Sequence, residues 1–420
     1  MKLRIISIFL AIIFLFSLFS LPLHAQTEQL DPIVRVRLAK ARLMLINNQN
    51  VDALRLLASL RNKYPDQPEI LFMDSIANRQ VGRWRRSFIL ITKAKKLAPD
   101  DKYINEFYRT LYKERQSFIA AGHSFEFRKP KAEQQITTLQ AEKIIYPFTN
   151  AGIQFQYNKT SADLLQRSNG VQEKTSASSS RGEIYLNHDY KKGDDSHLAL
   201  YLANDIGAGF AHNFWYPKGF NKVIIEYQRP NWNFLEGVVD EAVRDKIEVG
   251  RSQQFANRLF GDIAFGLHRY SLNDESNVLS TSFLKMNLFY NLKNKNSLVQ
   301  SLGKDSYITI GYNFDGEYKS SIKSKTRSNN TVFNPLQFSS REIHTGVITV
   351  GRQINRFLLL EGYAGISKNR FSGVAPAIGG KMIYEFLPQI ELTITASHSV
   401  STDSISDTSD RIEAIIKKRF

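Results

Sequence analysis

The fold is decided by two alternating segments, QIELTITASHSV at residues 389–400 and RIEAIIKKRF at residues 411–420. In the first segment one face carries mostly apolar residues: Ile390, Leu392, Ile394, Ala396, His398 and Val400. In the second segment Ile412, Ala414, Ile416 and Phe420 share a face, opposite Arg411, Glu413, Lys417 and Arg419. A period of two over this length is typical of β-strands and not of helices. The end of the chain is therefore predicted to form two strands.

Similar runs extend upstream to about Ala120, separated by turn residues. Fifteen candidate strands are predicted at 120–129, 134–146, 151–160, 180–191, 196–206, 221–229, 244–254, 257–271, 279–293, 305–319, 340–353, 356–368, 373–386, 388–401 and 409–420. The stretch Gly207–Glu241 is ambiguous. A barrel with both ends on one side of a membrane needs an even number of strands. We therefore expect a transmembrane antiparallel β-barrel of sixteen strands, with fourteen as the alternative.

The alternation also predicts how the strands face. Apolar sets such as Ile308, Ile310, Tyr312 and Phe314 would face lipid, and the polar residues between them would line a lumen. Closure would satisfy the strand edges, which lipid cannot hydrogen-bond. The stretches Lys159–Arg181 and Tyr318–Arg341 are predicted to be long extracellular loops, and Leu387-Pro388 a tight periplasmic turn. A soluble β-sandwich is the alternative for any single run.

The composition fits such a protein. The 420 residues include no cysteine, 23% charged residues, 28 Phe and 18 Tyr. Membrane strands do not appear in averaged hydropathy because only half of their residues are apolar. The formal charge is +16, and it becomes +14 without Lys2 and Arg4. In an exported protein this excess favours anionic lipids and polymers as partners, and not nucleic acid.

The N-terminus has the features of a secretory signal. Lys2 and Arg4 precede an apolar run from Ile5 to Leu23, and Ala25 offers a cleavage site. Residues 1–25 are predicted to be a signal peptide, so that the mature chain begins at Gln26. An uncleaved membrane anchor is the alternative, since the run is about long enough to span a bilayer.

Residues 31–117 change to helical periodicity. Pro65-Asp66 recurs as Pro99-Asp100 at a spacing of 34 residues, the tetratricopeptide period. Residues 26–119 are therefore predicted to form a periplasmic tetratricopeptide-like helical domain, and residues 120–420 the barrel. A plain bundle of helical hairpins is the alternative. Basic residues of the second unit could bind an acidic partner or form a solvated face: Arg79, Arg83, Arg85, Arg86, Lys93, Lys95 and Lys96.

Chemical motifs are few. Gly207-Ala208-Gly209 lacks the rest of a phosphate-binding loop, and the eight His residues are scattered without metal-site spacing. No catalytic, cofactor-binding or metal-binding residue is predicted, and no enzyme activity. One dense group is a candidate for lumen contacts with a sugar polymer, or for a salt-bridged network that holds the barrel's shape: Trp232, Glu236, Asp240, Glu241, Arg244 and Asp245.

The order of signal peptide, helical repeats and barrel resembles the outer-membrane exporters of bacterial exopolysaccharides, in particular the PelB type. In residues the resemblance rests on RPNWNFLEGVVD at 229–240 and GLHRYSL at 266–272. It implies a porin or secretin-like channel in the bacterial outer membrane, active in polysaccharide export and biofilm formation. The cargo would be an anionic or neutral polysaccharide.

The resemblance also implies partners. The helical domain would recruit periplasmic proteins of polysaccharide synthesis or modification, and the barrel would contact outer-membrane lipids and the barrel-assembly machinery, with Phe420 as terminal signal. The exporters carry many more helical repeats, and Lys418 is unusual so near the terminal Phe. The size is nearer to translocators that deliver proteins or lipoproteins to the cell surface, which is the alternative function.

Overall fold

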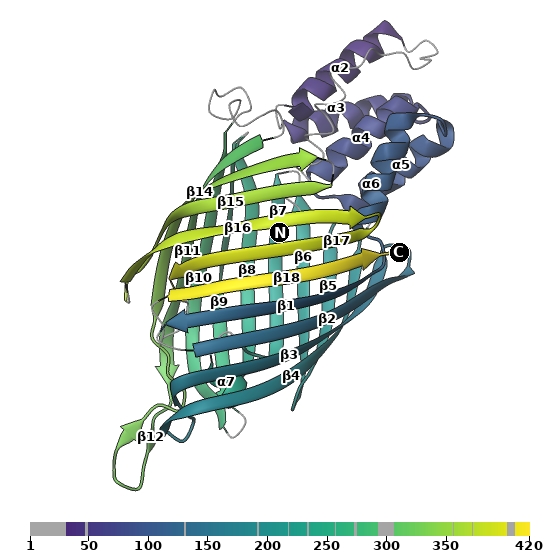
Figure 1. Ribbon diagram of the computed structural model, residues 1–420. Coiled ribbons are helices and arrows are strands. Elements are labelled where there is room, and N and C mark those ends of the chain that lie inside the picture. Colours follow the sequence, from purple (N-terminus) through teal and green to yellow (C-terminus); the bar gives the residue numbers. More distant parts are fainter. Residues whose placement is uncertain are drawn as a thin grey trace.

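The computed structural model describes residues 31–46, 49–129, 132–190, 193–216, 218–232, 235–256, 258–272, 275–292, 306–355, 357–371, 373–400 and 408–420. The predicted signal peptide lies outside these ranges. A group of helices sits at one end of a barrel of tilted strands (Figure 1). Within the described ranges, every helix is too short or too polar to cross a membrane.

Five helices form the N-terminal domain: α2 (Pro32–Ile46), α3 (Asn50–Lys63), α4 (Pro68–Gln80), α5 (Trp84–Leu97) and α6 (Lys102–Glu114). Their ends follow from local chemistry. Pro68 occupies the first turn of α4, where its missing N–H costs nothing. Gly82 has a positive φ of 83° between α4 and α5, and the Asp101 carboxylate accepts from two backbone N–H groups of α6.

The helices share one apolar core with small residues at the closest crossings. Ala41, Ala53 and Ala94 are fully buried there. Ser75 and Ser87, where small apolar residues would be usual, lie face to face between α4 and α5. Each hydroxyl donates to the other residue's carbonyl, at 2.7 and 2.8 Å. The helical region is as predicted, whereas its membership of the tetratricopeptide family stays a prediction.

The remainder forms a closed barrel of sixteen antiparallel strands. These are β1 (Phe118–Lys129), β2 (Ala132–Tyr146), β3 (Thr149–Gln166), β4 (Gln172–Asp189), β5 (Asp195–Leu202), β6 (Ile206–Tyr216), β7 (Gly219–Pro230), β8 (Val243–Ala256), β9 (Leu259–Leu272), β10 (Glu275–Asn291), β11 (Ser306–Ile322), β14 (Arg341–Asn355), β15 (Leu358–Asn369), β16 (Gly373–Leu387), β17 (Ile390–Val400) and β18 (Thr408–Arg419). The predicted barrel of sixteen strands is confirmed. The strand missing from the fifteen candidates is β6, which lies in the ambiguous stretch.

The terminal strand closes the barrel. β18 pairs with β17 and with β1, so that Phe118 lies opposite Arg419. The Phe420 N–H donates to the Ser117 carbonyl at 3.0 Å, beside the last helix. Closure between the first and last strands leaves no unpaired edge in this sheet.

We call the end that carries the helices the near end and the opposite one the distal end. At the near end several connections are tight, such as Pro147-Phe148 between β2 and β3. At the distal end two connections are long: residues 231–242, with the short helix α7 (Glu236–Val239), and residues 323–340, with the hairpin β12 (Lys325–Thr326) and β13 (Val332–Phe333). The predicted loop 159–181 was wrong in extent, since β3 and β4 continue through most of it and leave a turn at 167–171.

Side chains alternate between an apolar outer surface and a polar inner wall. Exposed outer residues include Ile153, Phe155, Ile184, Leu198, Leu200, Ile247, Phe265, Leu267, Ile310, Ile348, Ile366 and Ile416. Exposed aromatic residues lie toward both rims of this belt: Tyr146, Phe255, Phe357 and Phe386 toward the near end, and Phe125, Phe127, Tyr157 and Phe371 toward the distal end. Such a belt with aromatic rims is typical of transmembrane barrels.

Candidate functional site: the barrel interior and its distal lid

The inner wall carries charges that are paired across neighbouring strands. On β7 and β8, Glu226 pairs with Arg229 and, at 2.6 Å, with Arg244. One step nearer the helices, Glu248 lies between Lys222 and Lys246, at 2.5 and 2.6 Å. Inward positions on adjacent strands lie close enough for such pairing. Each carboxylate is thus held between two basic groups, which leaves an excess of positive charge along this side of the lumen.

A second polar cluster surrounds Glu317 on β11. Its side chain is only 2% exposed and accepts hydrogen bonds from the Thr281 and Tyr270 hydroxyls, at 2.7 and 2.8 Å. Arg341 of β14 forms an ion pair with Glu317 at 3.0 Å, and His268 contacts it at 2.8 Å. The cluster ties four strands together on the inside: β9, β10, β11 and β14. A buried carboxylate needs such a full set of partners.

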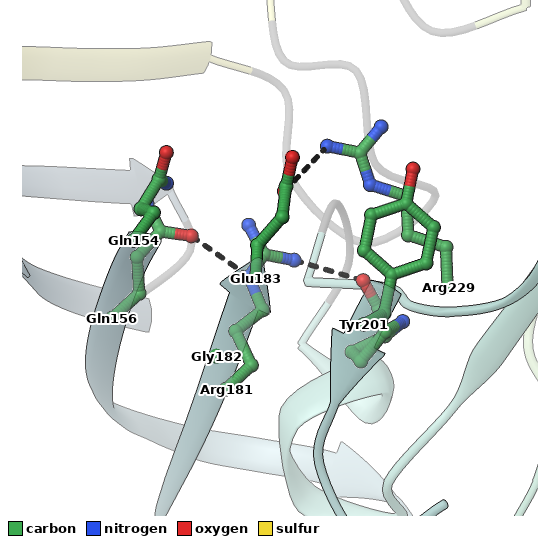
Figure 2. A pocket seen from close by; sticks show the side chains of 8 residues that line it. Gln154, Gln156, Arg181, Gly182, Glu183, Tyr201 and Arg229 are labelled. Carbon is green, nitrogen blue, oxygen red and sulfur yellow. Dashed lines mark hydrogen bonds and ion pairs between the residues drawn. The ribbon is translucent and has the colours of Figure 1, made fainter. Parts of the chain in front are cut away.

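On β3 to β5 the inner wall is hollowed by a small pocket (Figure 2). Arg181 crosses it, donating to the Gln156 amide and to the Pro230 carbonyl, both at 2.8 Å. Glu183 points to Arg229, at 3.8 Å. The pocket therefore lies where the wall meets the segment that follows β7.

The described part of that segment, residues 231–232 and 235–242, folds inward across the barrel. It leaves β7 and reaches the inner faces of β2 to β4, where Leu235 is buried against Ala132, Ala162 and Leu165. The Trp232 ring lies under the Arg181 guanidinium at 4.2 Å. Small residues on β2 and β3 make room for this packing, so the segment occupies part of the lumen.

The far end of the same segment is held by a charged contact. Asp240 accepts from Arg167 and from the Ser168 N–H, both at 3.0 Å, in the β3–β4 turn. Partial burial opposes the charged form of Arg167. The Asp240 and Glu173 carboxylates outweigh it and raise the pKa of Arg167 above its ordinary value. The contact is a charge-assisted latch between the segment and the turn.

Residues 323–340 approach the same turn from the opposite side. They connect β11 and β14, which lie halfway around the strand order from β3. Gln166 donates to the Asn334 carbonyl at 2.7 Å, and Gln337 donates to the Gln166 amide oxygen at 3.0 Å. The Phe333 ring packs on Gly170, where a Cβ would lie 2.6 Å from it. This segment therefore spans the distal opening.

The two segments also touch each other. Leu336 is fully buried in a cluster with Ala242, Tyr270 and Leu279. We call residues 231–242 and 323–340 together the distal lid. Because the lid rests on few apolar side chains and several polar contacts, it is less firmly packed than the strands.

Two buried polar side chains of the inner wall lack hydrogen-bond partners within the described residues. Both amide atoms of Asn158 and the hydroxyl of Thr160 are unsatisfied, although the residues are 0% and 1% exposed. Both lie on the inward face of β3. Unsatisfied buried groups cost free energy.

At the near end, the helical domain is docked on the turns of the barrel. The Arg85 guanidinium lies over the Phe148 ring at 4.4 Å and donates to the Asp189 carbonyl at 2.7 Å. Arg115 pairs with the Asp189 carboxylate at 2.9 Å. The Trp215 ring fills the space beside Gly82, where a Cβ would lie 2.3 Å from it. Several strand turns thus hold the domain.

The structure separates the residues predicted to contact a polymer. Trp232 and Asp240 lie in the distal lid, and Arg244 belongs to the Glu226 cluster of the inner wall. Asp245 shares the outward face of β8 and pairs with Arg269 at 2.6 Å, so it does not lie with the others. Glu241 is half-buried with a positive φ of 53°, and the Glu236 side chain lies outside the described set. Polymer contact stays a prediction for this group.

The predicted basic partner-binding face is also divided. Arg79 is buried and paired with Glu114 at 2.9 Å, and Lys93 pairs with Asp66 at 2.9 Å. Arg83 and Arg85 contact the barrel turns, and Arg86 lies near Asp74. Four of the basic residues, Arg79, Arg83, Arg85 and Lys93, therefore contact other parts of the chain, and the binding of an acidic partner by this group stays a prediction.

The sequence did not point to the second half of the lid or to Glu317. The sequence does carry a signal for residues 323–340, because this mostly polar stretch contains Phe333, Leu336 and Phe338. The Glu317 cluster draws on four strands, and its pairing depends on strand register. Within the described ranges, no group of three or more His, Asp or Glu side chains is arranged to hold a metal ion.

Comparison with known proteins shows a shared barrel fold. A bacterial polysaccharide outer membrane secretin matches with a TM-score of 0.51 and 8% identity, over 73% of this chain and 98% of that one. OprB of Pseudomonas putida matches with a TM-score of 0.40 and 6% identity, over 74% of this chain and 95% of its own. OccK11 of Pseudomonas aeruginosa matches with a TM-score of 0.37 and 9% identity, over 72% of this chain and 95% of that one. No protein-family model and no curated protein matches the sequence.

Proposed function

We propose that the protein is an outer-membrane channel that exports a polysaccharide. The observation that carries the proposal is the closed barrel of sixteen strands, with an apolar belt outside and a polar wall inside. Only helices and closed barrels satisfy their backbone groups within a bilayer. Sixteen strands also leave room for an aqueous lumen. The shared fold with a polysaccharide secretin supports the choice of cargo.

The inner wall suits passage of a polymer more than its capture. Charges such as Glu226, Glu248 and Glu317 are neutralised by nearby bases. The bases of these clusters outnumber the carboxylates but are held in ion pairs, so an anionic or a neutral chain would meet no isolated charge there. Side-chain hydroxyls and amides would offer weak, exchangeable hydrogen bonds to sugar hydroxyl groups.

In this proposal the distal lid is the gate, and the distal end faces the exterior. Longer connections are typical of the outer side of such barrels and tight turns of the periplasmic side. The helical domain would then lie in the periplasm, where it would recruit proteins that make or modify the polymer. The barrel would catalyse no reaction. The position of the lid would decide whether its lumen is open or closed.

Deletion of the gene in the native host tests the proposal. We expect surface polysaccharide to fall while polymer accumulates inside the envelope, and export to return with the wild-type chain. Surface polysaccharide that remains at its normal level, with polymer synthesis intact, would contradict polysaccharide export. Loss of a surface protein in its place would support the alternative of a protein translocator.

A further inference from the structure

Helix α2 is apolar on two nearly opposite faces. Val34, Leu38, Ala41 and Leu45 are buried against the rest of the domain. Ile33, Val36 and Leu43 recur at helical spacing on the other side and are 62%, 70% and 57% exposed. A helix at the surface of a soluble domain ordinarily has one apolar stripe. The second stripe indicates that another element covers α2.

The position of α2 strengthens this point. Helices that stack in pairs bury their faces on their neighbours, and the terminal unit of such a stack normally ends in a polar face. Here the end near α6 is covered by the barrel, for example through Lys113 and Glu385 at 3.1 Å. Among the described residues the other end finishes in α2, the helix farthest from the barrel (Figure 1). This end is apolar where a polar cap would be expected.

The charge of α2 indicates which kind of partner would cover its exposed face. The helix carries Arg35, Arg37, Lys40 and Arg42 and no acidic residue. Within the described ranges only Arg42 has an ion pair, with Glu69 at 3.8 Å. Residues 31–117 as a whole hold 18 basic and 9 acidic side chains, a net charge of +9. The exposed apolar stripe therefore lies within a strongly positive surface.

Building on the recruiting role proposed above for the helical domain, we propose that the exposed face of α2 (Ile33, Val36 and Leu43, flanked by Arg35, Arg37 and Lys40) docks an acidic amphipathic helix of a periplasmic partner. The partner helix extends the stack by one element and buries the apolar stripe. Its carboxylates lie against the basic flanks. Recognition by such a helix follows the spacing of the apolar anchors.

Other occupants fit this surface less well. A second copy would place four basic residues of one α2 against four of another, and like charges repel. The segment 1–25 of this chain is also basic and has no acidic residue. A bilayer that surrounds the apolar belt of the barrel would not reach α2, because the helix lies at the far side of the domain (Figure 1).

Peptide binding to the full-length chain in detergent tests the proposal. The probe is a stapled helical peptide of roughly 15 residues, long enough to be helical, with Leu at i, i+3 and i+7 and Glu on both flanks. Control peptides carry Lys in place of Glu, or Ser in place of Leu. We expect the acidic peptide to bind and both controls to bind at least about tenfold more weakly.

Matched variants of the protein show whether the peptide binds to the exposed face of α2. The double variant Val36→Ser and Leu43→Ser should weaken binding of the acidic peptide at least about tenfold, since two exposed anchors are lost. Ile89→Ser, at an exposed apolar position on α5, should leave it unchanged. Equal binding of acidic and basic peptides, or binding insensitive to the double variant, would overturn the proposal.

Photocrosslinking in cells provides a second readout. With a photoreactive residue at position 36, we expect a cross-link to an acidic helical segment of another protein, identified by the cross-linked peptide. A cross-link to lipid, to a second copy or to residues 1–25, or no cross-link, would overturn it. Channel conductance of the Val36→Ser and Leu43→Ser variant should stay normal, so failure of docking and failure of the channel can be told apart.

Discussion

The two ends of the barrel are built differently. At the near end several turns are tight, such as the one at residues 147–148, and the helical domain docks on turns of this end through contacts of Arg85 with Phe148 and of Gly82 with Trp215. At the distal end residues 231–242 and 323–340 cross the opening and meet at the β3–β4 turn. One end is extended by a folded domain with its own apolar core, and the other is closed by segments that depend on the barrel for support.

This difference indicates that the distal end moves more easily than the near end. The near-end domain buries a continuous core of about twenty apolar residues, which makes local opening costly. The lid is held by small apolar clusters, by Asp240 and by side-chain amides. We therefore expect a rigid near end and a distal end that opens.

The largest effect is expected from removal of half of the lid. Replacing residues 324–339 by a short Gly-Ser turn should leave the strands paired, because β11 and β14 remain in register. The distal opening would then be only partly covered, and single-channel conductance in a planar bilayer should rise severalfold. A variant that folds but conducts like the wild type would show that this segment does not close the channel.

The wall between the two ends should be rigid, and two glycines of β14 test it. A Cβ at Gly351 would lie 2.1 Å from the Tyr307 ring, which Glu361 fixes through a hydrogen bond of 2.5 Å. Gly351→Ala should lower the free energy of unfolding by about 1–3 kcal/mol through overpacking. It is measured by urea unfolding in detergent.

Gly346→Ala is the matched control on the same strand. No heavy atom of another residue lies within 4 Å of a Cβ there, so its effect on the unfolding free energy should be close to zero. Equal destabilisation by the two substitutions would contradict the packing of Tyr307 against the inner wall.

A smaller effect is expected at the charged latch of the lid. Asp240→Asn removes a carboxylate that accepts from Arg167 and from the Ser168 N–H. Loss of hydrogen bonds to a charged group ordinarily costs about 1.5–3 kcal/mol. The closed lid should lose less than this, because Arg167 is partly exposed and solvent weakens its ion pair. Channel recordings should show more frequent openings.

Arg167→Gln should give a similar increase, and the double variant little more, since the two residues act as one contact. Fully additive effects would mean that Asp240 and Arg167 act independently of each other.

The smallest effect is expected at the near end. Arg85→Ala removes a cation–π contact with Phe148 and a hydrogen bond to Asp189. We expect a cost of about 1 kcal/mol. Hydrogen exchange should become faster in the β2–β3 turn, with unchanged conductance. Arg55→Ala, at an exposed residue paired only with Asp52, is the control and should leave exchange in this turn unaltered.

The sequence predicted the fold well because strand alternation is a local signal. Fifteen of the sixteen strands and the β1–β18 closure were read from period-two patterns. β6 was missed because Gly207, Ala208, Gly209 and Ala211 weaken its alternation. Small residues there leave space beside the Tyr201 ring, which a Cβ at Gly209 would meet at 2.3 Å. Only the tertiary structure reveals that role.

The candidate site was less predictable. Trp232, Asp240 and Arg244 were singled out as a dense group of charges and aromatics, but sequence spacing did not separate the lid from the wall. Asp245 shows the difficulty, since one step along β8 moves its side chain from the lumen to the outer surface. The partners Arg167 and Arg181 come from distant strands, and no local pattern links them to residues 231–242.

The most direct test of the gating claim is the single-channel conductance of a chain whose lid can be locked. The chain has no cysteine, so Gln166→Cys and Gln337→Cys introduce a unique thiol pair where the two side chains lie 3.0 Å apart. A short bis-methanethiosulfonate cross-linker, which forms one disulfide with each thiol and releases methanesulfinate, should abolish large openings, and reduction of the disulfides should restore them. Conductance that is the same before cross-linking, after it and after reduction would contradict a gate at the distal lid.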